Sequence, residues 1–214
     1  MCDVQYRCEA KSVAGFVQQL ACCYLPHGYW FYVTGWVPER KTPDDVDRKL
    51  IEKYGIDISR QSRARRKRAG LANLHYLRFG QYFVLLATHG LHPSFEYEGR
   101  AIRDVRRVPI KFRGYSIAYK RGQYKRRAFP GDRAMADDKW HARVQIGRET
   151  YTELKAYFLE VASRRPADEL ARQLYSLPFE PYAPVRQQLL NILRLVNRAR
   201  KAAGVEPLDP QVLR

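Results

Sequence analysis

The sequence lacks any apolar run as long as a transmembrane helix, and its N-terminus lacks the charged start and cleavable apolar stretch of a signal peptide. It also lacks a P-loop and a G-x-G-x-x-G motif, the common phosphate-binding loops. Cysteine is scarce, and Cys2, Cys8, Cys22 and Cys23 do not form a paired C-x-x-C array. These absences predict a cytoplasmic protein with reduced thiols, no cofactor and no metal.

Acidic residues are missing from residues 60–68, where basic residues are concentrated. Six lie there: Arg60, Arg63, Arg65, Arg66, Lys67 and Arg68. Like charges this close repel one another, and salt screens the repulsion only in part. A nucleic-acid backbone relieves it, because each neutralised phosphate releases counterions. The alternative is a solvated surface loop. The stretch has almost no apolar face, so we expect its ligand to order it.

A second basic stretch runs from Arg100 to Arg127, where eleven Lys and Arg face only Asp104, giving 11 − 1 = +10. The whole chain carries +17, from 39 Lys and Arg against 22 Asp and Glu. Arginine predominates, and its planar fork suits phosphates and base stacking, which favours RNA or a single strand. The predicted binding residues here are Arg106, Arg107, Lys111, Arg113, Lys120, Arg121, Tyr124, Lys125, Arg126 and Arg127.

Aromatic residues near these stretches have two interpretations. Tyr76, Phe79, Tyr115 and Tyr119 offer stacking faces for bases, but core packing is the better explanation for each of them taken singly. An anionic membrane surface is a weaker alternative partner, since the sequence shows neither a long amphipathic basic helix nor a lipidation signal.

Hydrophobic periodicity predicts a mixed chain with a helical end. The expected elements are helices at 12–23, 42–54 and 98–107, and strands at 29–37, 72–79, 81–88, 108–112, 115–119 and 140–146. From 29 onward this is the split βαβ order of a ferredoxin-like antiparallel sheet, an α/β (α+β) fold often found in proteins that lay RNA across a sheet face.

The C-terminal third is predicted to be helical, with helices at 149–164, 166–177 and 185–203. We therefore expect a nucleic-acid-binding domain over 1–147, with a helical region over 148–214 packed on it. The basic stretches at 59–70 and 120–133 are insertions in the first domain.

In element order the chain resembles the single-strand tyrosine transposases and rolling-circle replication initiators. The resemblance implies a histidine pair that binds a metal and a tyrosine nucleophile on a later helix. The matching positions are His75 on a central strand and Tyr151 on the helix. The nearest histidine pair is His89 and His92, one residue further apart than in the family.

A second resemblance is to the CRISPR repeat-processing endoribonucleases, which are built of ferredoxin-like units. It implies metal-free cleavage with a histidine as general acid or base, here His27 beside Tyr29 and Lys41. The glycine-rich loop of that family is missing. The acids Asp44, Asp45, Asp47, Asp137 and Asp138 are interpreted as surface groups.

The sequence thus predicts a nucleic-acid-binding accessory subunit of a ribonucleoprotein or mobile genetic element, with RNA favoured and single-stranded DNA as the alternative ligand. The resemblances alone suggest the mobile element. Two other functions stay open. One is an enzyme that cleaves single-stranded DNA or RNA, and the other is an adaptor whose arginines bind an acidic protein.

Overall fold

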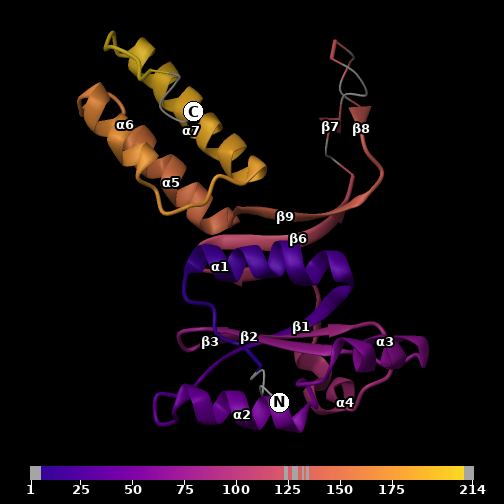
Figure 1. The fold of residues 1–214 in the computed structure, drawn as a ribbon. Helices are drawn as coiled ribbons and strands as arrows, with labels where there is room; N and C mark the ends of the chain where they lie inside the picture. Colours follow the sequence, from indigo (N-terminus) through magenta and orange to yellow (C-terminus); the bar gives the residue numbers. More distant parts are fainter. Residues whose placement is uncertain (1–5, 123–124, 127–129, 132, 134, 210–214) are drawn as a thin grey trace. The chain divides into compact units, whose positions relative to one another are not determined.

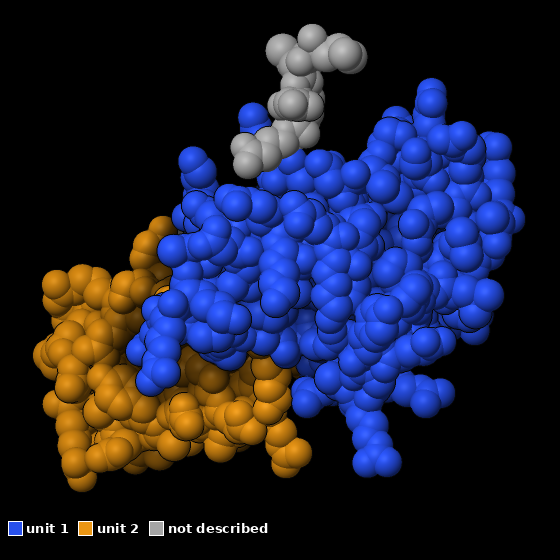
Figure 2. Space-filling view, turned by 90° about the horizontal axis from the view of Figure 1, so that it is seen from below, with its two compact units in different colours: residues 1–110, 117–142 blue, residues 111–116, 143–214 orange. Residues whose placement is uncertain are grey.

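The computed structural model describes residues 6–122, 125–126, 130–131, 133 and 135–209. The chain divides into two compact units, shown in separate colours in Figure 2. Unit 1 comprises Met1–Ile110 and Ile117–Ala142, and unit 2 comprises Lys111–Ser116 and Arg143–Arg214. The fold is mixed α/β, with two antiparallel sheets and a helical C-terminal region, as the sequence predicts.

The main sheet of unit 1 has the predicted ferredoxin-like topology. Its strands are β1 (Tyr29–Trp36), β2 (Leu74–Phe79), β3 (Tyr82–Thr88) and the short β4 (Arg103–Asp104). They lie in the order β2-β3-β1-β4, and every neighbouring pair is antiparallel. This is the split βαβ order, with β2 at one edge.

One face of this sheet is covered by the N-terminal helix (Figure 1). Helix α1 (Val13–Gln18) begins at Ser12, whose hydroxyl accepts a hydrogen bond from Gly15 N–H. It continues as a π-helical turn (Gln19–Tyr24) and a 3₁₀ turn (Leu25–His27). The Phe16 ring packs edge-on against the rings of Phe79 and Tyr82. Phe79, one of the rings predicted to stack on bases, is therefore covered by this helix.

The opposite face is covered by α2 (Pro43–Lys53), which Thr42 caps by accepting a hydrogen bond from Asp45 N–H. The core between α2 and the sheet includes Tyr54, Ile56, Leu74, Tyr76 and Leu85. Tyr76 is fully buried, and Tyr115 and Tyr119 are also buried, so these rings belong to the core.

The predicted helix at 98–107 is wrong. Helix α4 (Ser94–Glu98) ends at Gly99, whose φ of 42° suits glycine, and a 3₁₀ turn (Gly99–Ala101) leads into β4. The fourth strand of the sheet is thus β4. The strand predicted at 108–112 is β5 (Ile110–Phe112), which pairs in a second sheet of order β5-β6-β9.

The second sheet contains β6 (Tyr115–Arg121) and β9 (Trp140–Ile146), both close to their predicted ranges. Between them lies a two-stranded ladder of β7 (Lys125–Arg126) and β8 (Met135–Ala136). Several residues of the predicted tip at 120–133 lie outside the described residues.

Unit 2 is built on the predicted C-terminal helices α5 (Arg148–Val161), α6 (Ala167–Tyr175) and α7 (Ala183–Ala202). Phe158, Leu170, Leu174 and Ile192 are buried between them. The buried Arg200 of α7 donates hydrogen bonds to the carbonyls of Ala162 and Arg165, which follow the last turn of α5. Carbonyls at and beyond the end of a helix have no N–H donor within the helix. Arg200 supplies the donors for these two.

Candidate nucleic-acid interface

The first basic stretch is a folded helix, α3 (Arg60–Arg68). Ser59 caps it by accepting a hydrogen bond from Ser62 N–H at 3.2 Å. No residue of α3 is buried, as its composition predicts. The expectation that a ligand must order this stretch is nevertheless wrong, because its own arginines attach it to the protein.

Two of the six basic side chains point inward and bind main-chain carbonyls. Arg63 donates to Leu74 O at 2.8 Å and to Ile56 O at 2.5 Å. Arg66 donates to Ala72 O at 3.0 Å. In return, the Asn73 amide donates to Arg63 O at 3.0 Å. The helix is therefore held by guanidinium–carbonyl hydrogen bonds in place of an apolar face.

These bonds complete the outer edge of β2. Further along the strand, the Tyr6 hydroxyl accepts from Tyr76 N–H and lies 2.9 Å from Tyr76 O. Beyond it, Arg78 N–H donates to Cys8 O and Ala10 N–H donates to Arg78 O, both at 2.8 Å. An unpaired edge strand invites another strand to bind. The carbonyls of Ala72, Leu74, Tyr76 and Arg78 are instead all bound within unit 1.

The remaining basic side chains of α3 face solvent. These are Arg60, Arg65, Lys67 and Arg68, all of them exposed. Within the described ranges, no ion pair joins α3 to an acid, so these charges are not neutralised by carboxylates. The exposed Leu71 and Leu91 lie beside the end of the helix, where Leu91 N–H donates to Gly70 O at 2.9 Å.

Four cations of the second basic stretch are engaged with other groups. Arg106 pairs with Asp104 at 2.7 Å, Arg121 with Asp138 at 2.7 Å and Lys111 with Glu149 at 3.2 Å. Lys120 Nζ donates to Arg106 O at 2.6 Å. Burial opposes ionisation of Asp104, but the hydrogen bonds from Arg106 prevail and lower the pKa of that carboxyl.

The other predicted residues of this stretch fall into three groups. Arg107 and Arg113 are exposed. Lys125 and Arg126 lie in β7, while Tyr124 and Arg127 lie outside the described residues.

The structure does not bring the histidines of unit 1 together. The His75 ring lies 4.8 Å from the rings of Tyr24 and Tyr29, on the α1 side of the sheet. His89 contacts Phe31, whose ring packs against Phe95 near α4 on the other side. His92 Nδ1 lies 2.9 Å from the Ser94 hydroxyl. This arrangement differs from the adjacent pair that the transposase resemblance implies.

Burial makes His75 a poor proton carrier near neutral pH. Burial, and then the charge of Arg63, lower the pKa of His75 to about 3, and its Nδ1 lies 2.8 Å from the Tyr6 hydroxyl. Burial and the charge of Arg66 also lower the pKa of His92. Both imidazoles are therefore neutral at pH 7.

The other catalytic candidates have local roles. Tyr151 lies on α5 in unit 2, where Lys155 Nζ lies 4.8 Å from its ring centre. His27 Nδ1 lies 2.8 Å from Cys23 O, at the end of the N-terminal helical segment. Lys41 is exposed, whereas Tyr29 is buried against Tyr24.

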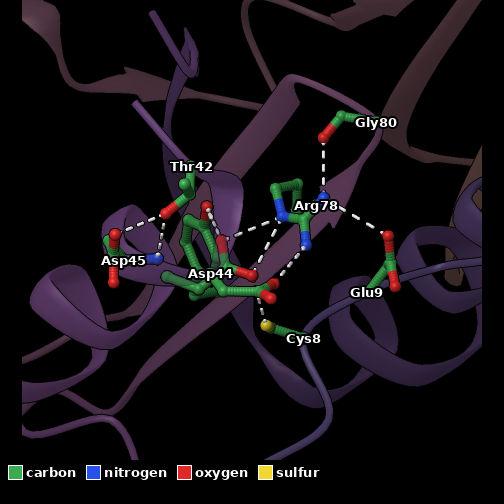
Figure 3. A network of polar contacts seen from close by, with 9 residues as sticks. Cys8, Glu9, Thr42, Asp44, Asp45, Arg78 and Gly80 are labelled. Carbon is green, nitrogen blue, oxygen red and sulfur yellow. Dashed lines mark hydrogen bonds and ion pairs between the residues drawn. The ribbon is translucent and has the colours of Figure 1, made fainter. Parts of the chain in front are cut away.

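Sequence reasoning missed a buried ionic cluster beside β2 (Figure 3). Arg78 Nε lies 2.9 Å from both carboxylate oxygens of Asp47, and the two side chains are only 5% and 8% exposed. The Tyr76 hydroxyl and the Cys8 thiol also donate to Asp47, at 2.7 and 3.1 Å. Burial, together with the Asp47 carboxylate, raises the pKa of Cys8 to about 12.

This cluster corrects the interpretation of Asp47 as a surface acid. Asp44, whose carboxylate lies 3.6 Å from Arg78 Nη2, and Asp45 are exposed as expected. Asp47 instead joins α2, β2 and the N-terminal segment. The available signal was its position one helical turn before Leu50 and Ile51, on the side of α2 that faces the core.

No helix among the described residues is long and apolar enough to cross a membrane. Among the same residues, no three His, Cys, Asp or Glu side chains gather as metal ligands. Comparison with protein-family models, with curated proteins and with solved structures finds no match to this chain.

Proposed function

We propose that the protein binds nucleic acid, RNA in preference to DNA, through the outer face of α3. One observation carries the proposal: α3 holds itself to β2 with Arg63 and Arg66, and thereby presents four basic side chains on a fixed frame. A preformed array loses less conformational entropy on binding than a disordered basic loop. Each phosphate that it neutralises releases counterions.

The preference for RNA rests on chemistry that arginine offers and lysine does not. Three of the four outward side chains are arginines, namely Arg60, Arg65 and Arg68. Their planar guanidinium groups bind phosphate with two parallel hydrogen bonds and stack on exposed bases. Bases are exposed in RNA loops and single strands, which are the usual targets of sequence-specific RNA recognition.

The proposal places the protein in the cytoplasm, in a nucleoprotein complex, as an accessory subunit. The thiols of Cys8, Cys22 and Cys23 are free, which agrees with a reducing compartment.

Fluorescence anisotropy with a labelled 12-nucleotide single-stranded RNA tests the proposal. The variant R60Q/R65Q/K67Q/R68Q removes the outward charges and keeps Arg63 and Arg66. For four phosphate contacts on a single strand, the slope of log K against log salt should fall by about 3. A DNA strand of the same sequence, measured in parallel, tests the preference for RNA.

A matched control removes four exposed cations from unit 2, in the variant R186Q/R194Q/R198Q/K201Q on α7. Both variants lower the net charge equally, so a general attraction between a basic protein and an anion weakens binding equally in both. The proposal requires the α3 variant to lose far more affinity. Equal losses, or wild-type protein that binds no nucleic acid, would refute it.

A further inference from the structure

The sheet residues of unit 1 include a column of stacked aromatic rings that runs from the core to an exposed indole. The rings of Trp30 and Tyr119 are stacked, with centres 6.0 Å apart and planes 26° apart. Tyr119 in turn stacks on Trp140, with centres 5.6 Å apart and planes 19° apart. The guanidinium of Arg106 lies 4.4 Å from the centre of the Trp30 ring.

A β-bulge in β1 explains how Trp30 joins this column. Tyr29 pairs with Thr88 and Phe31 pairs with Ala87, so Trp30 is an extra residue in the register. Its carbonyl accepts from Val105 N–H at 2.9 Å, and its indole N–H donates to Leu25 O at 3.1 Å. Bulges re-aim side chains and are common near functional sites. Trp30 is thereby fixed as the base of the column.

The column ends at an exposed tryptophan. Tyr119 is buried, whereas Trp140 is 44% exposed. An indole that is exposed on one side and held by a stacked ring on the other presents a fixed π face to solvent. Its orientation is set before any ligand arrives, since Tyr119 already lies parallel to it.

Basic groups lie beside the exposed indole. Arg121 and Tyr119 are two residues apart on β6 and share a face of the sheet, so Arg121 lies on the same face as the column. Its partner, Asp138, precedes Trp140 by two residues, and the two side chains of this ion pair are 60% and 86% exposed. Such an exposed pair contributes at most about 1 kcal/mol, so a phosphate can replace Asp138. Lys139 is also exposed.

We propose that Trp140 is a stacking platform for one unpaired base of a single-stranded nucleic acid, with Arg121 binding an adjacent phosphate. The inference rests on the proposed function and adds to it the strandedness of the ligand. An indole flanked by arginine is the arrangement that binds bases without sequence preference, because every base has a π face. A paired base in a duplex has no free face to offer.

The test compares Trp140→Ala with Trp36→Ala, using labelled 12-nucleotide poly(U) and a 12-base-pair RNA duplex. Trp36 is the matched control: it lies in the same unit, is 69% exposed and packs against the Tyr82 ring in a T-shaped arrangement. Trp140→Ala should weaken poly(U) binding by about 5- to 150-fold, the loss typical of one stacked base. Trp36→Ala should change it by less than about twofold, and neither variant should affect the duplex.

Salt dependence separates the two parts of the site. Stacking releases no counterions, so Trp140→Ala should leave the salt slope unchanged, whereas Arg121→Gln should lower it by about 0.7. Trp140→Phe, which keeps an aromatic face, should retain most of the affinity. If Trp140→Ala is poorly folded by circular dichroism, Trp140→Leu against Trp140→Phe makes the same comparison.

The measurements distinguish a failure of the Trp140 platform from a failure of the α3 interface. If R60Q/R65Q/K67Q/R68Q loses affinity and Trp140→Ala does not, the platform is refuted and the α3 interface stands. The same holds if Trp140→Ala weakens duplex and single strand equally. If wild-type protein binds neither RNA, both proposals are refuted.

Discussion

An arginine pairs with an aspartate both at β2 and at β6, but the pair at β2 is buried whereas the pair at β6 is exposed to solvent. At β2, Arg78 and Asp47 are almost fully buried, and Arg63 and Arg66 bind carbonyls of the strand edge and the segment before α3. At β6, Arg121 and Asp138 form an ion pair that is open to water. This difference in burial divides the cations of the protein into two kinds. Some stabilise the fold, and others are available to a ligand.

The largest loss of stability should appear when one partner of the buried pair Arg78–Asp47 is removed. Asp47→Ala leaves the guanidinium of Arg78 buried without its main carboxylate, and it also removes the acceptor for Tyr76 and Cys8. We expect the free energy of unfolding to fall by about 3–5 kcal/mol in urea denaturation. The matched control, Asp138→Ala at β6, should change it by less than about 1 kcal/mol. Equal effects at the two sites would remove the distinction between them.

The arginines of α3 should differ in how much each contributes to the stability of the fold. The double variant R63A/R66A leaves the carbonyls of the buried residues Ile56, Ala72 and Leu74 without these donors, which should lower the free energy of unfolding by about 2–4 kcal/mol. R65A/R68A removes the same charge from the outer face and should change stability by less than about 0.5 kcal/mol. If both double variants were equally stable, α3 would not depend on its inward arginines.

Stability around β2 should also depend on pH through His75. Its folded pKa of about 3 lies below the unfolded value near 6.5, so the unfolded state binds more protons between these values. The contribution of His75 to stability is therefore complete above pH 6.5 and falls by roughly 1.4 kcal/mol for each pH unit below it. Other groups titrate in this range, so the measurement is the difference between wild type and His75→Phe. The stability of wild type relative to His75→Phe should fall as pH falls from 6.5 towards 3, and a constant difference would contradict the burial of a neutral imidazole.

The smallest effect should come from the exposed pair between Lys111 and Glu149 in unit 2. Lys111→Ala should change the free energy of unfolding by less than about 0.5 kcal/mol, and the change should vanish in 0.5 M salt. Thermal melting at low and high salt measures it. A loss above 1 kcal/mol would place this lysine with the structural cations of the β2 region.

Local patterns predicted most elements because their signals are local. Thr42, Pro43 and the acids after them specify the start of α2, and the apolar residues around Gly80 specify the hairpin of β2 and β3. The order of these elements was enough to predict three of the four strands of the ferredoxin-like sheet, β1, β2 and β3. The helix expected at 98–107 failed because Ala101, Ile102 and Val105 fit helical spacing, while pairing with β1 held residues 103–104 extended.

The sequence predicted where the candidate site lies, but not which of its residues face a ligand. The charge of 60–68 identified the interface, but no local signal separates Arg63 and Arg66 from their neighbours, because their partners belong to Ile56 and to the β2 edge. Asp47 was misread because its partner Arg78 lies 31 residues away in the sequence, although its position one helical turn before Leu50 and Ile51 indicated the buried side of α2. Trp140 was recognised only as part of a half-exposed strand.

The sequence alone specifies the excess of positive charge, its concentration in two stretches, and the alternation of apolar residues that builds an antiparallel sheet with a helical end. These follow from composition and local periodicity, which need no knowledge of partners. The tertiary structure alone decided which cations are bound inside the protein, which sheet face is covered, and where an aromatic ring stays exposed. Such outcomes depend on contacts between residues far apart in the chain, and only folding brings those residues within hydrogen-bonding or stacking distance.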